Sequence, residues 1–315
     1  MIFKKPKFWD FSNPNLFSYL LFPFTIPIRI NNFILDHKTK IKSKNFFTIC
    51  VGNIYVGGTG KTPTSIKLNK ILSKHNLNVS IGKKFYPNHK DEIQILNKET
   101  NLLINSSRDK ILALKNPNTD VIIFDDGLQD QKIDYDIKFV CFDCLNWIGN
   151  GLLIPAGPLR ETLNSLKKYD AVFLKNFNNS NKNILKIIKK INPKIRIFFT
   201  SFKIININKI NLSQKYLIFS GIGNPNDFKN ILIKNKIKIV HEITFPDHFN
   251  YKTDNLRKIK KIAKKYKAKL ITTEKDYVKL PKNQKKGINF IKIELLFKNQ
   301  RSLIDFIKKK INEKY

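Results

Sequence analysis

The sequence predicts an α/β fold: a P-loop NTPase-like domain with a parallel β-sheet, a second and smaller α/β domain, and an N-terminal membrane-associated segment. Short apolar runs alternate with segments of helical periodicity along most of the 315 residues, as expected for parallel strands joined by crossover helices. A glycine-rich loop follows the first of these runs. The chain also begins with an aromatic, apolar stretch shorter than the roughly 20 residues needed to span a bilayer.

The expected boundaries follow from changes of pattern along the chain. Residues 1–35 form the N-terminal segment, 36–205 the nucleotide-binding domain, and 206–315 a C-terminal α/β domain that contributes to the active-site cleft. An Asn-rich stretch over 204–214 marks the boundary between the two domains. We expect strands at 46–51, 79–81, 121–124, 139–142, 171–174, 216–219, 239–245, 270–272 and 290–293, and helices at 62–75, 227–234 and 253–267.

The N-terminal segment over residues 16–28 is almost wholly apolar or aromatic. Pro23 and Pro27 interrupt it, Arg29 ends it, and several lysines precede it. It has no small-residue cleavage site of the kind that ends a signal peptide. We expect it to lie in a membrane interface, with lysines on anionic head groups and aromatic rings at the acyl boundary. The alternative is a core helix packed against the first domain.

The glycine-rich loop reads GGTGKT over residues 57–62 and precedes a helical pattern. In a P-loop, backbone N–H groups surround phosphate oxygens, the lysine reaches the outer phosphates, and the following threonine ligates Mg²⁺. The strict signature has glycine six residues before the lysine, where this chain has Tyr55, so the alternative is an ordinary glycine-rich turn. We predict that a nucleoside triphosphate is bound by Tyr55, Val56, Gly57, Gly58, Thr59, Gly60, Lys61 and Thr62.

A pair of carboxylates supplies a second signal. The apolar run 121–124 ends in Asp125 and Asp126, followed by Gly127. In P-loop enzymes an aspartate at a strand end holds Mg²⁺ near the loop threonine. We therefore predict that Asp125 or Asp126 ligates the metal together with Thr62, although Asp-Asp-Gly alone would also suit a simple turn.

Composition narrows the choice of partners. The formal net charge of +35 would suit nucleic acid or an anionic membrane. Only 6 of the 59 basic residues are arginine, the residue best suited to reading bases and phosphates, and lysines occur along the whole chain. We therefore expect no nucleic-acid partner. Cys50, Cys141 and Cys144 are too few for a disulfide framework or a zinc site, and we expect buried thiols.

Several polar segments follow strands or interrupt loops. Residues 149–161 contain three glycines and two prolines and end in Arg160 and Glu161; this is either a turn-rich connector or a loop that holds phosphate through its arginine. His248 follows Asp247 at a strand end, which favours a role in a cleft over a structural one.

Three further segments are less distinctive. Residues 90–92 (KDE) and 272–276 (TTEKD) would by composition alone be solvated surface. The glycines at 221 and 223 lack the third glycine and the downstream acid of a dinucleotide-binding fingerprint, so we discount that function.

Together these segments resemble the tetraacyldisaccharide 4′-kinase family, also called lipid A 4′-kinases, over nearly the whole chain. The resemblance rests on residues 51–53, 57–63, 125–129, 149–161, 219–225, 245–248 and 272–276. The 149–161 stretch and the Pro-Asp-His motif are more specific than the P-loop. The chain departs from the family at 82–86, where GKKFY stands near the usual Ser-Arg-Gly-Tyr, and at Leu128 and Asp130, where Phe and His are usual.

The resemblance implies a kinase that transfers the γ-phosphoryl group of ATP, with Mg²⁺, to the 4′-hydroxyl of tetraacyldisaccharide 1-phosphate in lipid A biosynthesis. It implies catalytic roles for Lys61, for Asp91 as general base, and for His248, which would bond to Asp91 from the other domain on domain closure. Arg160 and Glu161 would line the nucleotide site.

The resemblance also implies a location and partners. The chain would be a peripheral or monotopic protein at the cytoplasmic face of the inner (plasma) membrane. Its partners would be the lipid A disaccharide 1-phosphate and the membrane surface, with no obligate protein partner. Two other functions stay open on the residues alone. A membrane-associated P-loop NTPase that couples hydrolysis to a conformational change would need no acceptor-side base, and a non-enzymatic polybasic membrane or RNA binder would not need Lys61.

Overall fold

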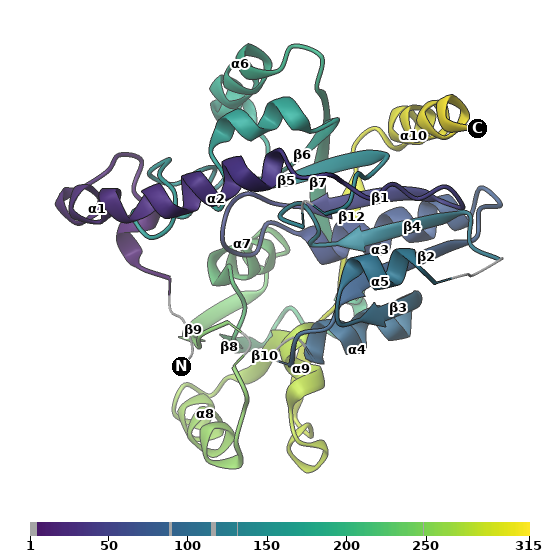
Figure 1. Ribbon diagram of the computed structural model, residues 1–315. Coiled ribbons are helices and arrows are strands. Elements are labelled where there is room, and N and C mark those ends of the chain that lie inside the picture. The colour runs from purple at the N-terminus through teal and green to yellow at the C-terminus, as the bar shows by residue number, and fades with distance from the viewer. Residues whose placement is uncertain (1–4, 88–89, 115–117, 131, 248) are drawn as a thin grey trace. The chain divides into compact units, whose positions relative to one another are not determined.

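The computed structural model describes residues 5–87, 90–114, 118–130, 132–247 and 249–315, and for Lys90 and Asp91 it describes the backbone alone. The chain divides into two compact units. The larger unit comprises residues 5–86, 96–201 and 296–315, and the smaller unit comprises residues 87–95 and 202–295. The predicted α/β fold with parallel strands is confirmed (Figure 1).

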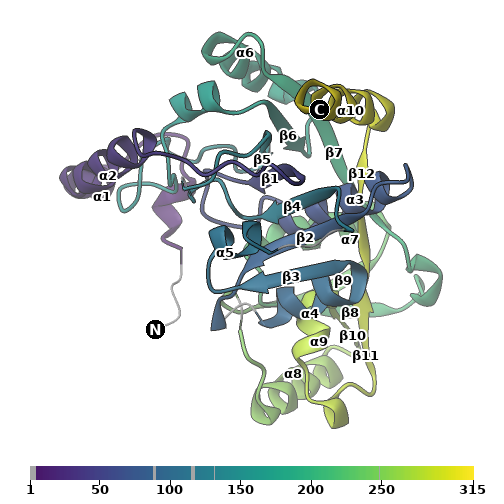
Figure 2. The ribbon, with the colours of Figure 1, turned by 45° about the vertical axis from the view of Figure 1, so that its right-hand side comes forward.

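The larger unit is built on an eight-stranded sheet in the order β12-β7-β6-β5-β1-β4-β2-β3. All strand pairs from β7 to β3 are parallel, and Figure 2 shows β1, β4, β2 and β3 side by side. The strands are β1 (Phe47–Gly52), β2 (Val79–Lys84), β3 (Asn101–Asn105), β4 (Val121–Asp125), β5 (Ile137–Asp143), β6 (Ala171–Lys175), β7 (Arg196–Ile204) and β12 (Ile293–Phe297). The helices along this part of the chain are α1 (Leu16–Leu21), α2 (Ile26–Asp36), α3 (Lys61–Ser73), α4 (Lys90–Glu99), α5 (Arg108–Leu112), α6 (Lys182–Ile191) and α10 (Gln300–Lys314).

The central strands form from continuous apolar runs. Every residue of β1, β4 and β6 is buried, which is typical of parallel strands that are covered on both faces. Phe47 pairs with Val121 and Ile49 pairs with Ile137. Because these strands run in the same direction, the carboxyl end of β1, where the glycine-rich loop begins, lies beside Asp125 at the end of β4.

The last twenty residues belong to the larger unit, whereas the sequence analysis placed them in the C-terminal domain. Lys314 near the end of α10 donates hydrogen bonds to the Phe46 carbonyl at 2.8 Å and to the Asp136 carboxylate at 2.9 Å. The Phe306 ring lies 6.2 Å from that of Phe139. These contacts over the start of β1 and over β5 fix the C-terminal helix to the larger unit.

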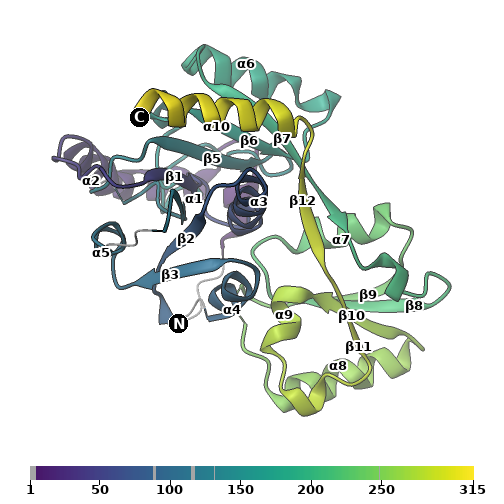
Figure 3. The ribbon, with the colours of Figure 1, turned by 90° about the vertical axis from the view of Figure 1, so that its right-hand side faces the viewer.

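The smaller unit has a four-stranded parallel sheet in the order β11-β10-β8-β9. Residues of β8 alternate between two cores: Tyr216 packs in one with Phe228 of α7, and Leu217 packs in the other with Leu256 of α8. The two helices therefore cover opposite faces of the sheet (Figure 3). The elements are β8 (Lys215–Ser220), α7 (Pro225–Lys234), β9 (Lys238–Thr244), α8 (Thr253–Lys265), β10 (Lys269–Thr273), α9 (Glu274–Lys279) and β11 (Ile288–Ile291).

The N-terminal helices have the reverse of the usual amphipathic arrangement. Ser18 and Thr25 are buried, whereas Leu16, Phe17 and Phe24 are 72%, 63% and 63% exposed. Pro23 lies in the 3-10 helix Phe22–Thr25, which separates α1 from α2, and Pro27 lies in the first turn of α2. The segment is thus anchored by polar contacts and presents its apolar side chains outward. Within the described part of the chain, no helix is both long and apolar enough to cross a bilayer.

Candidate active site

The glycine-rich loop is organised by a buried asparagine at the end of β1. Asn53 Nδ2 donates to the carbonyls of Tyr55 at 2.5 Å and Gly57 at 3.3 Å, and to Thr59 Oγ1 at 3.0 Å. Its Oδ1 accepts a hydrogen bond from Lys61 Nζ at 3.1 Å. One side chain therefore holds the loop closed and fixes the direction of the lysine.

Two glycines of the loop have backbone angles that other residues adopt only with strain. Gly57 has φ of 141° and Gly60, which precedes the first turn of α3, has φ of 89°. Tyr55 has no such requirement, because it forms an antiparallel bridge with Leu159, and Val56 N donates to the Pro158 carbonyl at 2.8 Å. This pairing explains why the first glycine of the strict signature is not needed here.

The Tyr55 side chain is part of the protein interior. Its hydroxyl donates to Asp10 Oδ1 at 2.5 Å and accepts from Lys5 Nζ at 2.9 Å. The ring packs with Leu153 and Leu159. Only the backbone of Tyr55 is therefore left for the phosphate-binding role predicted for it.

Asp125 is fully buried and accepts hydrogen bonds from three side chains. Thr62 Oγ1 lies 3.0 Å from Oδ2 and Ser65 Oγ lies 3.1 Å from Oδ1. Lys83 Nζ forms an ion pair with Oδ2 at 2.5 Å, and the Lys83 side chain is itself almost fully buried. Thr62 therefore lies beside the strand-end carboxylate of Asp125, as predicted, and the buried ammonium of Lys83 lies beside the same carboxylate.

Asp126 faces two cations. Its Oδ1 lies 3.6 Å from Lys61 Nζ and 3.2 Å from Arg160 NH1. Burial alone would raise the pKa of this carboxyl, but Lys61 and Arg160 outweigh burial and lower the pKa to about 2. Asp126 is therefore ionised throughout the physiological range, with φ of 59° and a backbone carbonyl that accepts from Arg108.

The loop over residues 149–161 brings its final Arg-Glu pair to the same region. Arg160 NH1 donates to Gln129 Oε1 at 3.0 Å as well as to Asp126. Glu161 is buried, where it accepts from Gln129 Nε2 and from the Tyr169 hydroxyl, each at 2.9 Å, and burial raises the pKa of its carboxyl. Arg160 therefore contributes a positive charge to the site, whereas Glu161 accepts a hydrogen bond from Gln129 and holds that side chain in place.

The start of that loop is fixed to the N-terminal segment. Asn150 N donates to the Trp9 carbonyl at 3.0 Å, and Asn150 Nδ2 donates to Ser18 Oγ at 2.9 Å. A Cβ on Gly149 would lie 2.0 Å from the Trp9 carbonyl oxygen, so only glycine fits there. Gly149 therefore allows close packing against the N-terminal segment.

Sequence reasoning missed four polar residues that build this site. They are Asn53, Lys83, Arg108 and Gln129. Arg108 is one of only six arginines in the chain, and Asn53 and Gln129 lie in segments that carry the family resemblance; these were the available signals. Nothing local marked Lys83 among so many lysines.

The structure describes only part of the predicted acceptor side. The Asp91 side chain and the whole of His248 lie outside the described residues, so their roles stay predictions. For Asp91 and His248 the structure gives only the surrounding segments: residues 87–95, which the sequence analysis placed in the nucleotide-binding domain, belong to the same compact unit as residues 202–295. Their neighbours Glu92 and Asp247 each lie 3.4 Å from Lys275 Nζ.

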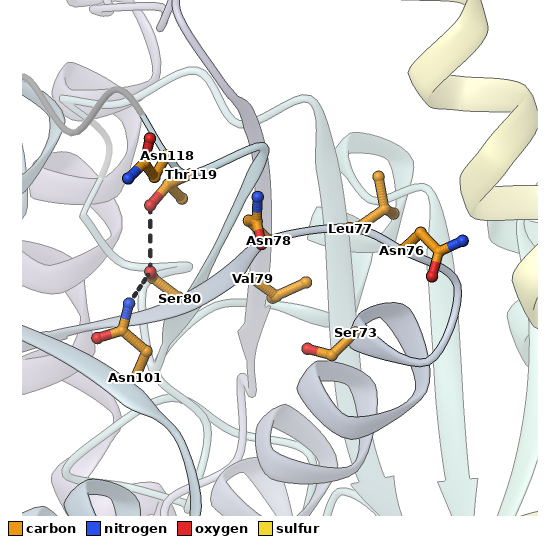
Figure 4. A pocket seen from close by; sticks show the side chains of 9 residues that line it. All are labelled: Ser73, Asn76, Leu77, Asn78, Val79, Ser80, Asn101, Asn118 and Thr119. Atoms are coloured by element: carbon orange, nitrogen blue, oxygen red, sulfur yellow. Dashed lines mark hydrogen bonds between the residues drawn. The ribbon is translucent and has the colours of Figure 1, made fainter.

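A separate cavity of about 470 Å³ lies at the opposite end of the strands from the P-loop. Its lining includes Asn78, Ser80, Asn101 and Thr119, which precede or begin strands (Figure 4). Asn101 Nδ2 donates to Ser80 Oγ, which also bonds to Thr119. The lining residues that the structure describes carry no charged side chain, so they offer no cation to a triphosphate. The cysteines are buried and free, as predicted.

A glycine-rich loop between a central parallel strand and a helix, with a strand-end aspartate bonded to its threonine, defines a nucleotide-dependent P-loop enzyme. The family model described as LpxK, tetraacyldisaccharide-1-P 4′-kinase, matches residues 17–312. The chain therefore belongs to the tetraacyldisaccharide 4′-kinase family.

Individual relatives agree with this assignment. The tetraacyldisaccharide 4′-kinase of Pelagibacter ubique (strain HTCC1062) is 47% identical over 100% of both chains. That of Rickettsia akari (strain Hartford) is 34% identical over 97% of each. A crystal structure of LpxK from Aquifex aeolicus, described as an "apo" form in complex with ATP, matches with a TM-score of 0.68 at 21% identity. It covers 94% of this chain and 100% of that one, and at this identity it shows the shared fold.

Proposed function

We propose that this chain transfers the γ-phosphoryl group of ATP to the 4′-hydroxyl of tetraacyldisaccharide 1-phosphate, the kinase step of lipid A biosynthesis. The observation that carries the proposal is the P-loop geometry in a chain that belongs to this kinase family: Lys61 is held by Asn53, and Thr62 is bonded to Asp125. The proposed acceptor is a lipid head group, which agrees with the outward apolar surface of α1 and α2.

On the phosphate side, the chain supplies fixed positive groups where charge develops. The glycine-rich loop and the start of α3 supply backbone N–H groups to the phosphates, except at Val56 and Thr59, whose N–H groups donate to the carbonyls of Pro158 and Gly57. Lys61 neutralises charge on the transferring group. Arg160 adds a second cation, held by Asp126 at 3.2 Å and by Gln129 at 3.0 Å. Lys61 is already held by the buried Asn53, and Arg160 by the half-buried Asp126 and Gln129, so little reorganisation is needed.

Mg²⁺ fits the donor set of this site. A hydroxyl from Thr62 and a carboxylate from Asp125, 3.0 Å apart, are hard oxygen donors of the kind that Mg²⁺ prefers. Among the described residues there is no group of three or more His, Cys, Asp or Glu side chains suited to a metal, and Mg²⁺ at such sites needs none because it keeps waters and phosphate oxygens as ligands. When bound, it offsets negative charge on the β- and γ-phosphates.

On the acceptor side, Asp91 takes the proton of the 4′-hydroxyl as that oxygen attacks phosphorus, and His248 orients the carboxylate or tunes its pKa. The family resemblance and the placement of residues 87–95 in the same unit as 202–295 support this pairing. Transfer to the lipid is tested by incubating purified protein with labelled ATP and lipid A disaccharide 1-phosphate and separating the lipids by thin-layer chromatography. Label in the lipid supports the proposal, and label in inorganic phosphate alone contradicts it.

The membrane partner proposed here is the anionic interface at the cytoplasmic face of the inner membrane. Its support is the apolar surface over α1 and α2, where Phe17, Leu20 and Phe24 are each 63% exposed. Replacing all three by serine should weaken partitioning into phosphatidylglycerol-containing vesicles at least 100-fold, because each side chain contributes about 1.5–3 kcal/mol when fully buried.

The matched control replaces two exposed isoleucines elsewhere, Ile187 and Ile233, by serine. This control should float with vesicles as the unaltered protein does. High salt should remove only part of the unaltered protein, because apolar burial persists when charge is screened. Complete extraction by salt, or equal flotation of the triple variant, would show that the apolar surface does not enter the membrane.

A further inference from the structure

The polar segment over residues 272–276 closes β10 and begins α9, and most of its side chains have structural partners. Thr272 Oγ1 donates to the Phe219 carbonyl at 2.7 Å. Thr273 Oγ1 accepts from Asp276 N at 3.0 Å and so caps α9. Asp276 is fully buried and accepts from Gly221 N at 3.0 Å. These bonds tie the carboxyl end of β8 to that of β10.

Lys275, in contrast, forms ion pairs with two other segments of the chain. Its ammonium lies 3.4 Å from Glu92 Oε1 and 3.4 Å from Asp247 Oδ1, with 21% of the side chain exposed. One cation thus joins the first turn of α4 to the turn that follows β9. Both segments and Lys275 itself belong to the smaller unit.

The two carboxylates adjoin the residues proposed for the acceptor side. Glu92 directly follows Asp91, and Asp247 directly precedes His248. We propose that Lys275 is a positioning residue for phosphoryl transfer, which fixes these two segments against each other so that Asp91 and His248 act on one hydroxyl. This inference rests on the proposed kinase function and on the acceptor-side roles of those two residues.

The expected effects of losing Lys275 on the rate and on the stability distinguish a positioning role from a stabilising one. Partly exposed ion pairs contribute about 0–1 kcal/mol each, so Lys275 adds little to the free energy of unfolding. A displacement of about 1 Å at reacting groups, however, can lower a rate about 100-fold. Loss of Lys275 should therefore change the rate far more than the stability.

The test compares Lys275→Met with Lys275→Arg and with Lys292→Met. Lys292 is a matched control, since its ammonium lies 3.8 Å from Glu274 in the same segment and its side chain has a similar 30% exposure. Lys275→Met should lower kcat for lipid phosphorylation about 10- to 100-fold, with KM for ATP and Tm nearly unchanged. Lys275→Arg should recover much of that loss, and Lys292→Met should behave as the unaltered protein.

A second comparison distinguishes positioning from general damage. In an Asp91→Ala background, Lys275→Met should cause little further loss, because residues that act as one unit lose activity non-additively. Normal kcat in Lys275→Met, a loss that parallels a fall in Tm, or a fully multiplicative loss with Asp91→Ala would overturn the inference while leaving the kinase proposal intact. Absence of lipid phosphorylation by the unaltered protein would overturn both.

Discussion

Replacing Lys83 by methionine should destabilise the larger unit by an amount that the structure allows us to predict. Lys83 and Asp125 form an ion pair at 2.5 Å with both side chains buried. Removing one partner of such a pair leaves an uncompensated buried charge, which typically costs about 3–5 kcal/mol. The hydroxyls of Thr62 and Ser65 remain on the carboxylate but carry no charge.

The expected change in Tm is large enough for a thermal-shift assay. For units of about 150–250 residues, each kcal/mol lowers Tm by roughly 2–4 °C, so Lys83→Met should lower it by about 6–20 °C. Lys84→Met is the matched control, because Lys84 is the next residue of β2 and its side chain points to the other face, near the Tyr86 ring. Surface changes of this kind usually alter stability by less than about 0.5 kcal/mol.

Ligand dependence sharpens the prediction. Mg²⁺ with a nucleotide should raise the Tm of Lys83→Met more than that of the unaltered protein, since a cation at Asp125 replaces the lost ammonium. A Lys83→Met variant with the Tm of Lys84→Met would refute the reasoning. An equal Mg²⁺-nucleotide shift in Lys83→Met and in the unaltered protein would refute the assignment of Asp125 to the metal.

Three further predictions concern the site. Lys61→Ala should lower kcat about 10²–10³-fold by removing a donor to the transferring phosphoryl group, with vesicle flotation unchanged; near-normal turnover would contradict the P-loop assignment. Asp126 has its pKa lowered from 3.8 to about 2 in the folded state, so its contribution to stability is complete above about pH 4 and is lost as the pH falls through 2. Urea unfolding should therefore show Asp126→Asn less stable than the unaltered protein at pH 6 and equally stable near pH 2, and a constant difference would contradict this account. Asp91→Ala and His248→Ala should each lower kcat with ATP affinity retained, and the double variant should be little worse than the poorer single one; fully multiplicative losses in that cycle would mean that the two residues act independently.

Most of the strands that sequence reasoning found are buried along nearly their whole length, although β9 was also found and its side chains are exposed or half-buried. β1 and β4 are apolar at nearly every position, and both were predicted within two residues of their observed ends. β3 (Asn101–Asn105) was missed because only three apolar residues lie between its terminal asparagines, and β7 (Arg196–Ile204) was missed because polar residues interrupt it. Both strands also have exposed side chains. The C-terminal helix α10 was missed because lysines interrupt the apolar pattern in its sequence, which makes the face that carries Phe306 hard to recognise.

The candidate site was predictable where topology alone decides it. Parallel strands place Asp125 beside the loop that contains Thr62, and the structure has these side chains 3.0 Å apart. The buried supports were not predictable, because burial of a polar group depends on partners that are distant in the sequence. Asn53 donates hydrogen bonds to the loop that follows it in the sequence. Lys83 pairs with Asp125 only because β2 and β4 are adjacent in the sheet.

The most direct test of the central claim measures phosphate transfer and ATP consumption together. Purified protein in vesicles that contain lipid A disaccharide 1-phosphate should form one 4′-phosphorylated lipid for each ADP released, with phosphorus NMR locating the new phosphate. Without the acceptor lipid, ADP release should be close to the rate of Lys61→Ala. ADP release that is independent of the lipid, with no phosphate at the 4′ position, would contradict the kinase assignment and favour an NTPase that uses hydrolysis to change conformation.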